Sequence, residues 1–315
     1  MPPTGNADLD VYPLSLGGNT FGWTTGEEQS FAILDAYAAA GGNFIDTSDS
    51  YSAWVPGHSG GESEAIIGAW RKARRNSDQV IVATKVSQHP RFRGLGAANI
   101  AAAADASLQR LQAGHIDLYY AHVDDPATPL EETVAAFGEL QKAGKVRHVG
   151  VSNYSGARLR EWIAAARAGG WPLPVALQPH YNLVARQPYE SELAPVAAEH
   201  GLGVVPYFAL AAGFLTGKYR TEADLRVAAR GQMAGRYFSA AGLKVIDVMD
   251  AVAAAHGAQL ASVAIAWLLA RPGVIAPIAS ATSPAQLAAL TAGTGLALAP
   301  GEVAALDEAS AAVAG

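Results

Sequence analysis

The sequence contains no cysteine among its 315 residues. Disulfides, thiolate zinc sites and cysteine nucleophiles are therefore excluded. The eight histidines are scattered, and no two of them are spaced three or four residues apart. This spacing argues against a histidine-based metal site on one helix, so we expect no metal.

Charge is also scarce. Charged residues make up 16% of the chain and the formal net charge is −6, which argues against a nucleic-acid partner. The first eight residues lack the basic and apolar regions of a secretory signal. Residues 272–301 carry no charge, but four prolines interrupt them, so a membrane span is a poor interpretation. We expect a cytoplasmic protein with neither a nucleic-acid nor a membrane partner.

What the sequence does contain is a repeated alternation of short apolar strands and helical patterns, and half of its residues are apolar. Strands are predicted at residues 14–18, 43–46, 80–85, 116–123, 146–151, 175–178, 203–207 and 274–279. Eight strands, each followed by a helix, favour an α/β fold of the (β/α)8 TIM-barrel type over an open doubly wound sheet. No GxGxxG motif follows a strand. We predict a single TIM-barrel domain over residues 1–315.

One segment interrupts the alternation. Residues 208–242 form a long, glycine-containing connection after the seventh strand. Connections of this length are uncommon in compact domains unless they are functional, so we expect the segment to be functional.

Three neighbouring strands end on or just before an ionisable residue, namely Asp46, Lys85 and His122. Tyr51 lies five residues beyond Asp46, in a loop rich in Ser, Gly and Pro. In a barrel the C-terminal strand ends meet at one face, so we expect these four side chains to lie together. A solvated loop position would explain any one of them alone, but the coincidence of four favours a site.

The motifs DTSDSY (46–51), VIVATK (80–85) and DLYYAH (117–122) resemble the Asp-Tyr-Lys-His tetrad of the aldo-keto reductases, which are NADPH-dependent TIM-barrel oxidoreductases. The resemblance runs from about residue 14 to about residue 290. It implies that Tyr51 is the general acid in carbonyl reduction and the base in alcohol oxidation. Lys85 would lower the pKa of Tyr51, and Asp46 would hold Lys85 charged. A neutral His122 would orient the carbonyl.

The same resemblance implies a dinucleotide across the C-terminal face of the barrel. Amide and hydroxyl groups would bind the carboxamide, Tyr207 would stack on the nicotinamide, and the segment 208–219 is similar to the family's pyrophosphate loop. The expected cofactor contacts are Gly18, Asn19, Asp46, Ser152, Asn153, Gln178, Tyr207, Leu210, Gly213, Leu215, Lys218, Arg236, Ser280, Thr282 and Gln286.

The adenosine end departs from the family pattern, because Thr282 stands where an Arg is common and Leu290 where an Asn is common. NADPH is still the expected cofactor, with NADH as the alternative. Ser283 and Pro284 begin a helix whose free N–H groups suit a phosphate. No Asp or Glu lies within residues 251–301, where a carboxylate would favour NADH.

The expected substrate is a small carbonyl compound, an aldehyde or a ketone. Trp23, Trp54 and the segment Gln88–Pro90 are predicted to surround it, as an aromatic wall for an apolar or sugar-like face. Packing within loops explains these residues equally well. The oligomeric state, the physiological substrate and the preferred direction are not predicted.

Other functions stay open at this point. They are a cofactor-binding regulatory subunit with little turnover, an NAD(H)-preferring alcohol or sugar dehydrogenase, an aldolase and a glycosidase. The aldolase would use Lys85 as a Schiff base, which needs a lowered lysine pKa that Asp46 would oppose. The glycosidase would need Asp124 or Asp125 paired with Asp46.

Overall fold

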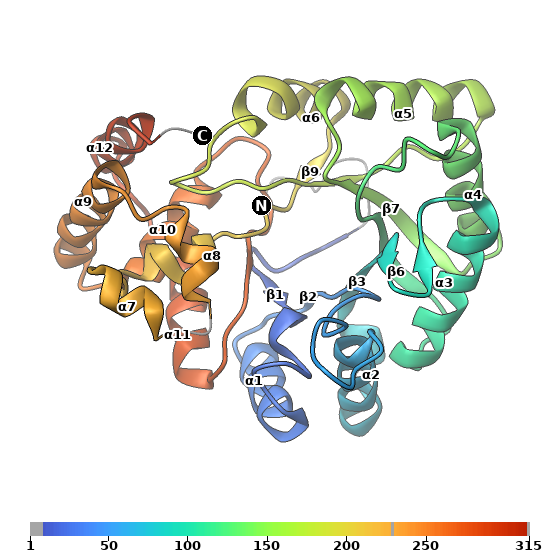
Figure 1. The fold of residues 1–315 in the computed structure, drawn as a ribbon, viewed down its shortest axis with the longest axis horizontal. Helices are drawn as coiled ribbons and strands as arrows, with labels where there is room; N and C mark the ends of the chain where they lie inside the picture. Colours follow the sequence, from blue (N-terminus) through green and yellow to red (C-terminus); the bar gives the residue numbers. More distant parts are fainter. Residues whose placement is uncertain (1–8, 228–229, 314–315) are drawn as a thin grey trace.

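The structure is a computed structural model that describes residues 9–227 and 230–313. Eight parallel strands curl around a central axis, and the helices lie outside them (Figure 1). In sheet order the strands are β10 (Ile278–Ala279), β1 (Ser15–Gly17), β2 (Phe44–Asp46), β3 (Ile81–Val86), β6 (Ile116–Ala121), β7 (Val146–Ser152), β8 (Ala176–Gln178) and β9 (Gly203–Val204).

The sheet closes on itself between β9 and the segment that leads into β10. Val204 forms a parallel bridge with Val274, and the Ile275 N–H donates to the Val204 carbonyl at 2.9 Å. On the other side β10 pairs with β1. The predicted (β/α)8 barrel is therefore confirmed.

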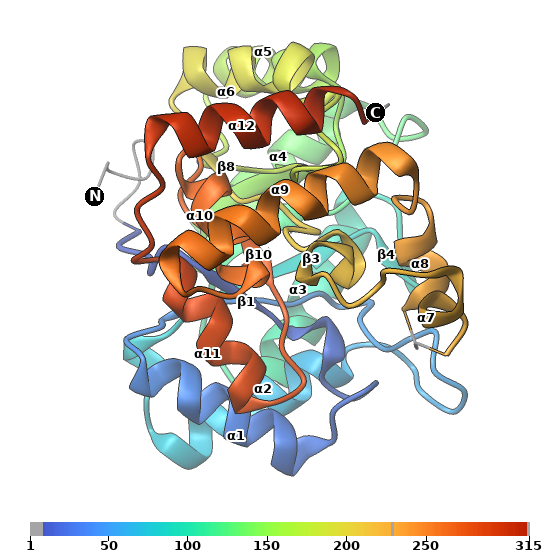
Figure 2. The same cartoon turned by 90° about the vertical axis from the view of Figure 1, so that its left-hand side faces the viewer.

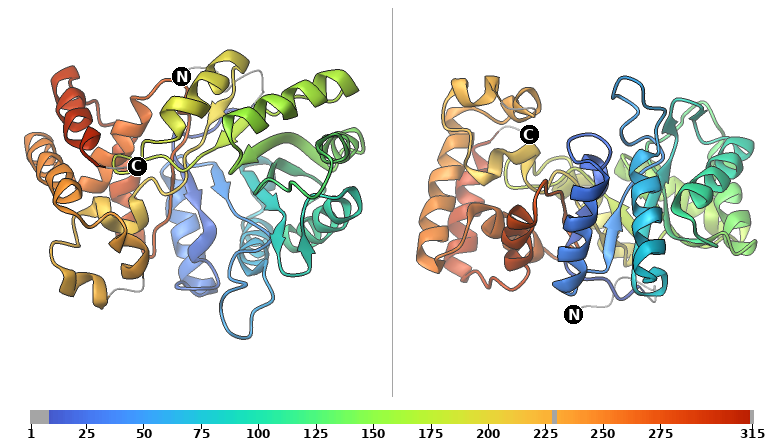
Figure 3. Two further views of the ribbon diagram at one scale, coloured as in Figure 1. Left: turned by 45° about the horizontal axis from the view of Figure 1, so that its top comes forward. Right: turned by 90° about the horizontal axis from the view of Figure 1, so that it is seen from below.

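Twelve α-helices are found within the described ranges, and most of them form the outer layer of the barrel (Figure 3). They bury apolar stripes against the strands, as Leu159, Trp162 and Ile163 of α5 do. The helices are α1 (Glu27–Ala39), α2 (Glu62–Arg74), α3 (Ala97–Leu111), α4 (Leu130–Lys142), α5 (Gly156–Gly169), α6 (Ala194–His200), α7 (Glu222–Arg226), α8 (Gly231–Gly235), α9 (Ala240–His256), α10 (Leu260–Leu269), α11 (Pro284–Gly293) and α12 (Pro300–Ala311).

Helices α9 and α12 lie side by side (Figure 2). In the part of the chain that the structure describes, no single helix is long and apolar enough to cross a membrane. Helices α9 and α10 meet that criterion only as a pair, which is bent by 95°.

Two features were not predicted from the sequence. An antiparallel hairpin, β4 (Gln88–His89) with β5 (Phe92–Arg93), follows β3. The long segment after β9 contains a 3₁₀ helix, Ala211–Thr216, followed by α7 and α8. Residues 228–229 of this segment and the N-terminal residues 1–8 lie outside the described ranges.

Candidate active site

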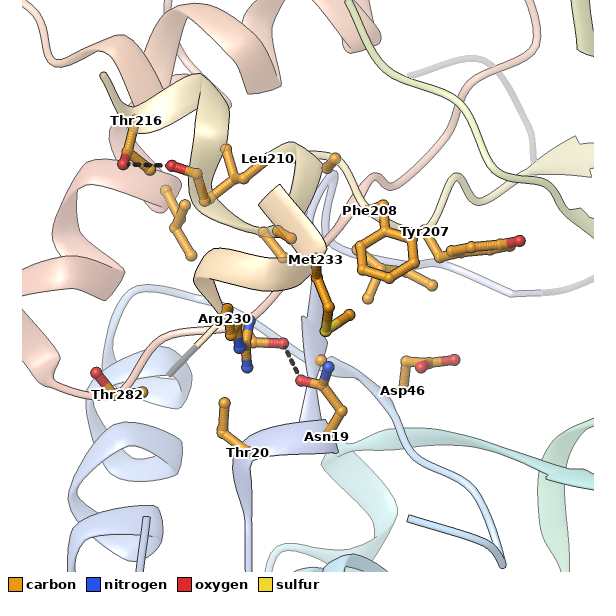
Figure 4. A pocket seen from close by; sticks show the side chains of 18 of the residues that line it. Asn19, Thr20, Asp46, Tyr207, Phe208, Leu210, Thr216, Arg230, Met233 and Thr282 are labelled. Carbon is orange, nitrogen blue, oxygen red and sulfur yellow. Dashed lines mark hydrogen bonds between the residues drawn. The ribbon is translucent and has the colours of Figure 1, made fainter. Parts of the chain in front are cut away.

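A cavity of about 730 Å³ lies at the C-terminal ends of the strands (Figure 4). This volume falls in the range of ligand pockets. Strand ends form one end of the cavity, and the other end is formed by the segment after β9 together with the start of α11.

Asp46, Lys85 and Tyr51 form one hydrogen-bonded group. Lys85 is completely buried, and its ammonium lies 2.7 Å from Asp46 Oδ2, 2.7 Å from the Thr47 carbonyl and 3.0 Å from the Tyr51 hydroxyl. The Tyr51 hydroxyl donates to Asp46 Oδ2 at 3.2 Å. The neighbouring strands β2 and β3 therefore bring together three of the four residues expected to be catalytic.

Burial dominates the ionisation of this group. It raises the pKa of Tyr51 well above its usual value, and the Asp46 carboxylate raises it further. Burial also lowers the pKa of Lys85, by more than Asp46 raises it. Burial therefore outweighs the expected charge effects: the pKa of Tyr51 is raised overall, and the pKa of Lys85 is lowered although Asp46 acts to raise it. Tyr51 remains a neutral phenol, which is the form that can donate a proton.

His122 follows β6 and faces the same group, with its ring centroid 6.5 Å from that of Tyr51. Burial, followed by the charge of Lys85, lowers its pKa to about 3. The imidazole is therefore neutral near pH 7, as expected. Its Nδ1 lies 3.4 Å from Ser48 Oγ.

Amide and hydroxyl side chains at the ends of β7 and β8 lie next to these four residues and form hydrogen bonds there. The Gln178 side chain donates to Asp46 Oδ1 at 2.9 Å, and Ser152 Oγ donates to the Gln178 carbonyl at 2.9 Å. Asn153 donates to the His122 carbonyl at 2.8 Å. The predicted carboxamide-binding residues are therefore held next to the catalytic candidates and line the cavity with them.

Tyr207 forms the adjoining wall. Its hydroxyl donates to Asn153 Oδ1 at 2.7 Å, and its ring stacks on His180 with centroids 5.4 Å apart and an interplanar angle of 15°. The sequence did not point to His180. Its contact fixes the plane of the tyrosine ring that lines the cavity.

The far end of the cavity is lined by Asn19, Leu210, Gly213, Lys218, Ser280, Thr282 and Gln286, all of which were predicted as cofactor contacts. Ser280 Oγ donates to Asn19 Oδ1 at 2.6 Å. Gln286 Oε1 accepts hydrogen bonds from the backbone N–H and the hydroxyl of Thr282. Ser283 caps α11 with Pro284 at its first position, as predicted.

Three predicted cofactor residues do not line the cavity. Gly18 packs closely against Ser63, because an added Cβ would lie 2.7 Å from Ser63 Oγ. The neighbouring Gly17 lines the cavity instead. Leu215 is completely buried in the hydrophobic core. Arg236 donates to the Met233 carbonyl at 3.2 Å and lies over aromatic rings.

Arg230 lines the cavity in place of Arg236 (Figure 4). Its Nη2 is buried with no hydrogen-bond partner among residues 9–227 and 230–313. Its guanidinium lies 5.5 Å from the centre of the Trp23 ring. The sequence places Arg226, Arg230 and Arg236 in one segment and gives no signal that selects among them.

Trp23 and Trp54 both line the cavity, as expected. Their rings are 5.6 Å apart and nearly perpendicular, and Trp54 also makes an edge contact with Tyr51. Trp54 is 52% exposed, so the aromatic wall reaches the surface. The segment Gln88–Pro90 does not line the cavity, because His89 packs on Phe92 within the β4–β5 hairpin.

The aldolase and glycosidase alternatives are not supported, because the side chains that they require are held by other contacts. Lys85 is completely buried and its ammonium contacts three acceptors, so it is not free to attack a carbonyl as an aldolase lysine would. Asp124 is paired with Arg158, and Asp125 accepts the Leu95 N–H. Neither aspartate lines the cavity, so no glycosidase carboxylate pair is present there.

A (β/α)8 barrel that brings Tyr, Lys, Asp and His to one end of a long cavity defines a class of barrel oxidoreductases. The sequence profile of the Aldo/keto reductase family matches residues 13–311, and the chain belongs to this family. Family membership supports NAD(P)-dependent carbonyl oxidoreduction as the class of reaction.

The chain is similar over most of its length to reductases and to a potassium channel subunit. It is 32% identical to norsolorinic acid reductase B of Aspergillus parasiticus, over 96% of this chain and 82% of that protein. It is 34% identical to aldo-keto reductase YhdN of Bacillus subtilis, over 89% and 83%. It is 33% identical to a probable voltage-gated potassium channel subunit beta of Oryza sativa subsp. japonica, over 90% and 87%.

Proposed function

We propose that the protein reversibly reduces aldehydes or ketones with NADPH, using Tyr51 as the general acid and base. The observation that carries this proposal is the position of the Tyr51 hydroxyl. It lies between a buried ammonium at 3.0 Å and a carboxylate at 3.2 Å, and the tyrosine lines the cavity beside a neutral histidine.

The residues along the cavity fit a dinucleotide. Ser152, Asn153 and Gln178 offer both donors and acceptors at one end, which suits a carboxamide. Lys218 and Arg230, whose Nη2 has no hydrogen-bond partner in the described part of the chain, supply positive charge further along, which suits a pyrophosphate. The bound cofactor would supply a hydride to the carbonyl carbon.

The protein's own residues would then protonate the carbonyl oxygen and stabilise the charge that develops. Tyr51, kept neutral by burial, donates its proton to that oxygen. Lys85, 3.0 Å away, stabilises the phenolate that remains, and Asp46 holds Lys85 in place. His122, neutral, donates a hydrogen bond that orients the carbonyl.

The aromatic wall indicates the kind of substrate. Trp23 and Trp54 meet edge to face, and Trp54 continues the contact to Tyr51. A flat apolar group beside the carbonyl would bury its surface against these rings. We therefore propose carbonyl compounds that carry an aromatic or other flat apolar group, in a protein located in the cytoplasm.

The preference for NADPH over NADH rests on the adenosine end. The hydroxyls of Ser280 and Thr282 line the cavity close to the N-terminus of α11, and helix N-termini favour phosphate. Residues 251–301 contain no carboxylate that would select the free ribose hydroxyl. An NAD(H)-preferring dehydrogenase is the competing assignment.

The test is a panel of aromatic and aliphatic aldehydes and ketones, followed by NADPH absorbance. We expect turnover with the wild-type protein and almost none with Tyr51→Phe. Tight NADPH binding without turnover of any carbonyl would instead favour a regulatory subunit, the kind of function that the name of the rice relative describes. A failure to bind either coenzyme would overturn both assignments.

A further inference from the structure

A second buried carboxyl group, Asp49, lies on the loop between Asp46 and Tyr51. Asp49 is completely buried, and its Oδ1 lies 3.3 Å from Ser48 Oγ. Its Oδ2 has no hydrogen-bond partner among the described residues. An ionised carboxylate with one hydroxyl contact would be costly at such a position, so a protonated Asp49 is favoured.

The charges around Asp49 support the protonated form. Burial, followed by the nearby Glu64 carboxylate, raises the pKa of Asp49 well above its usual value. The cations that face Asp49 already have partners, since Arg110 Nε lies 2.6 Å from Glu64 Oε2 and Lys85 is bound to Asp46. No hydrogen bond from either cation to the Asp49 carboxyl is found among the described residues, and their charges together with the Ser48 contact lower its pKa by less than burial and Glu64 raise it.

Ser48 connects Asp49 to His122. Ser48 Oγ lies 3.3 Å from Asp49 Oδ1, 3.4 Å from His122 Nδ1 and 3.0 Å from Ser50 Oγ. It also accepts the Ser50 N–H at 3.2 Å. A hydroxyl has one hydrogen to donate, so the group that donates to Ser48 decides which group Ser48 can donate to.

The protonation state of Asp49 determines which group donates in each hydrogen bond between Asp49, Ser48 and His122. An ionised Asp49 accepts a hydrogen bond from Ser48 Oγ through Oδ1. A protonated Asp49 would instead donate to that oxygen, whose two acceptor positions would then be filled by Asp49 and the Ser50 N–H. Ser48 can then give its own hydrogen to His122 Nδ1 or to Ser50 Oγ, but it has no acceptor position left for a hydrogen on Nδ1. A neutral imidazole that accepts at Nδ1 carries its hydrogen on Nε2, the nitrogen that has no partner within the described ranges.

We propose that Asp49, acting through Ser48, is a positioning residue that fixes the Nε2–H tautomer of His122. An ionised Asp49 would reverse both hydrogen bonds, because Ser48 would donate to the carboxylate and His122 Nδ1 would donate to Ser48. Nε2 would then be an acceptor facing the carbonyl oxygen. The link to carbonyl orientation rests on the proposed function, whereas the tautomer itself does not.

The test is nitrogen-15 NMR of the histidine rings in the full-length protein, with the His122 signals identified from His122→Asn. We expect Nδ1 of His122 to be an acceptor and Nε2 to carry hydrogen. Asp49→Asn keeps a donor beside Ser48, so it should keep this tautomer and most of kcat. Ser48→Ala and Asp49→Leu should shift His122 to a mixture of tautomers. Each should lower kcat on the order of tenfold without changing NADPH affinity.

Ser50→Ala is the matched control, since Ser50 lies on the same loop and has no contact with His122. It should leave the tautomer unchanged. The proposal is overturned if Asp49→Asn changes the tautomer as Asp49→Leu does, or if Ser48→Ala leaves it unchanged. Should Asp49→Leu fail to fold, Ser48→Ala still decides the question. The NMR result holds even if no carbonyl is turned over, so it is separable from a failure of the proposed function.

Discussion

The two ends of the cavity are built differently. At the catalytic end, side chains from β2, β3, β7 and β8 are buried and hydrogen-bonded to one another, as Lys85 and Gln178 are to Asp46. At the far end the walls come from the segment after β9 and the start of α11, and Arg230 has a buried nitrogen, Nη2, with no hydrogen-bond partner among the described residues. The catalytic end is therefore preorganised, whereas the far end has a charged group still to be matched by a ligand.

Positive backbone φ values occur at both ends of the cavity, since Ser52 and Asn153 at the catalytic end have values of 70° and 55°. Phe208, Ala211 and Ala212 at the far end have positive φ values of 56°, 49° and 57°. Non-glycine residues in this region cost on the order of 1–3 kcal/mol each and persist only where the surroundings hold them. Such strain clusters at ligand sites, which agrees with the expectation that the long segment is functional.

Tyr51→Phe should have the largest effect, because it removes the proposed proton donor at the preorganised end. We expect turnover to fall on the order of a thousandfold with the fold and the NADPH affinity retained. Steady-state kinetics and coenzyme fluorescence titration measure the two quantities. A variant that keeps most of its turnover would exclude Tyr51 as the general acid.

Lys85→Met should reduce turnover nearly as much, and it should also destabilise the fold. Removing one partner of a buried pair leaves the Asp46 carboxylate uncompensated, at a cost of about 3–5 kcal/mol in the free energy of unfolding. The pKa of Tyr51 should rise further, because the neighbouring cation is gone.

Denaturant unfolding and tyrosine titration measure these two effects of Lys85→Met. The control is the double variant with Asp46→Asn, which should recover part of the lost stability. A tyrosine titration that is unchanged in Lys85→Met would remove the lysine from the mechanism.

Arg230→Met should act at the far end and leave the catalytic end intact. We expect NADPH affinity to fall by about 1.5–3 kcal/mol, the usual strength of a hydrogen bond to a charged group, with kcat little changed. Arg236→Met is the matched control, because that arginine lies in the same segment but does not line the cavity. Equal losses in the two variants would contradict the assignment of Arg230.

Thr282→Arg should have the smallest effect. The wild-type ratio of kcat/KM for NADPH over NADH should exceed one, and the added guanidinium should widen it roughly tenfold through a charge-assisted contact to the 2′-phosphate. Thr282→Ser is the control for any change of side chain at this position. A wild-type ratio at or below one would make the NADPH prediction wrong.

The strand-end residues were predictable because a parallel barrel leaves little freedom there. Once Asp46, Lys85 and His122 are seen to end neighbouring strands, the topology brings them to one face. Distances of 2.7 Å from Lys85 to Asp46 and 3.0 Å to Tyr51 agree with that inference. The eight-strand order followed from the regular alternation in the same way.

The far end could not be predicted equally well, because loops lack a period that fixes which side chain faces inward. Arg236, Leu215 and Gly18 were expected along the cavity, but Arg230 and Gly17 line it instead. The hairpin β4–β5 was missed because its two-residue strands are too short to give a pattern.

The sequence by itself determined the barrel and the identity of the residues at its strand ends, through hydrophobic periodicity and chain order. Only the tertiary structure decided their ionisation. Whether Lys85 lowers the pKa of Tyr51, or burial raises it, depends on how completely both side chains are removed from water. The raised pKa of Asp49 and the contact between Ser48 and His122 likewise appear only in the folded structure, because desolvation and hydrogen bonding depend on contacts between residues distant in the chain.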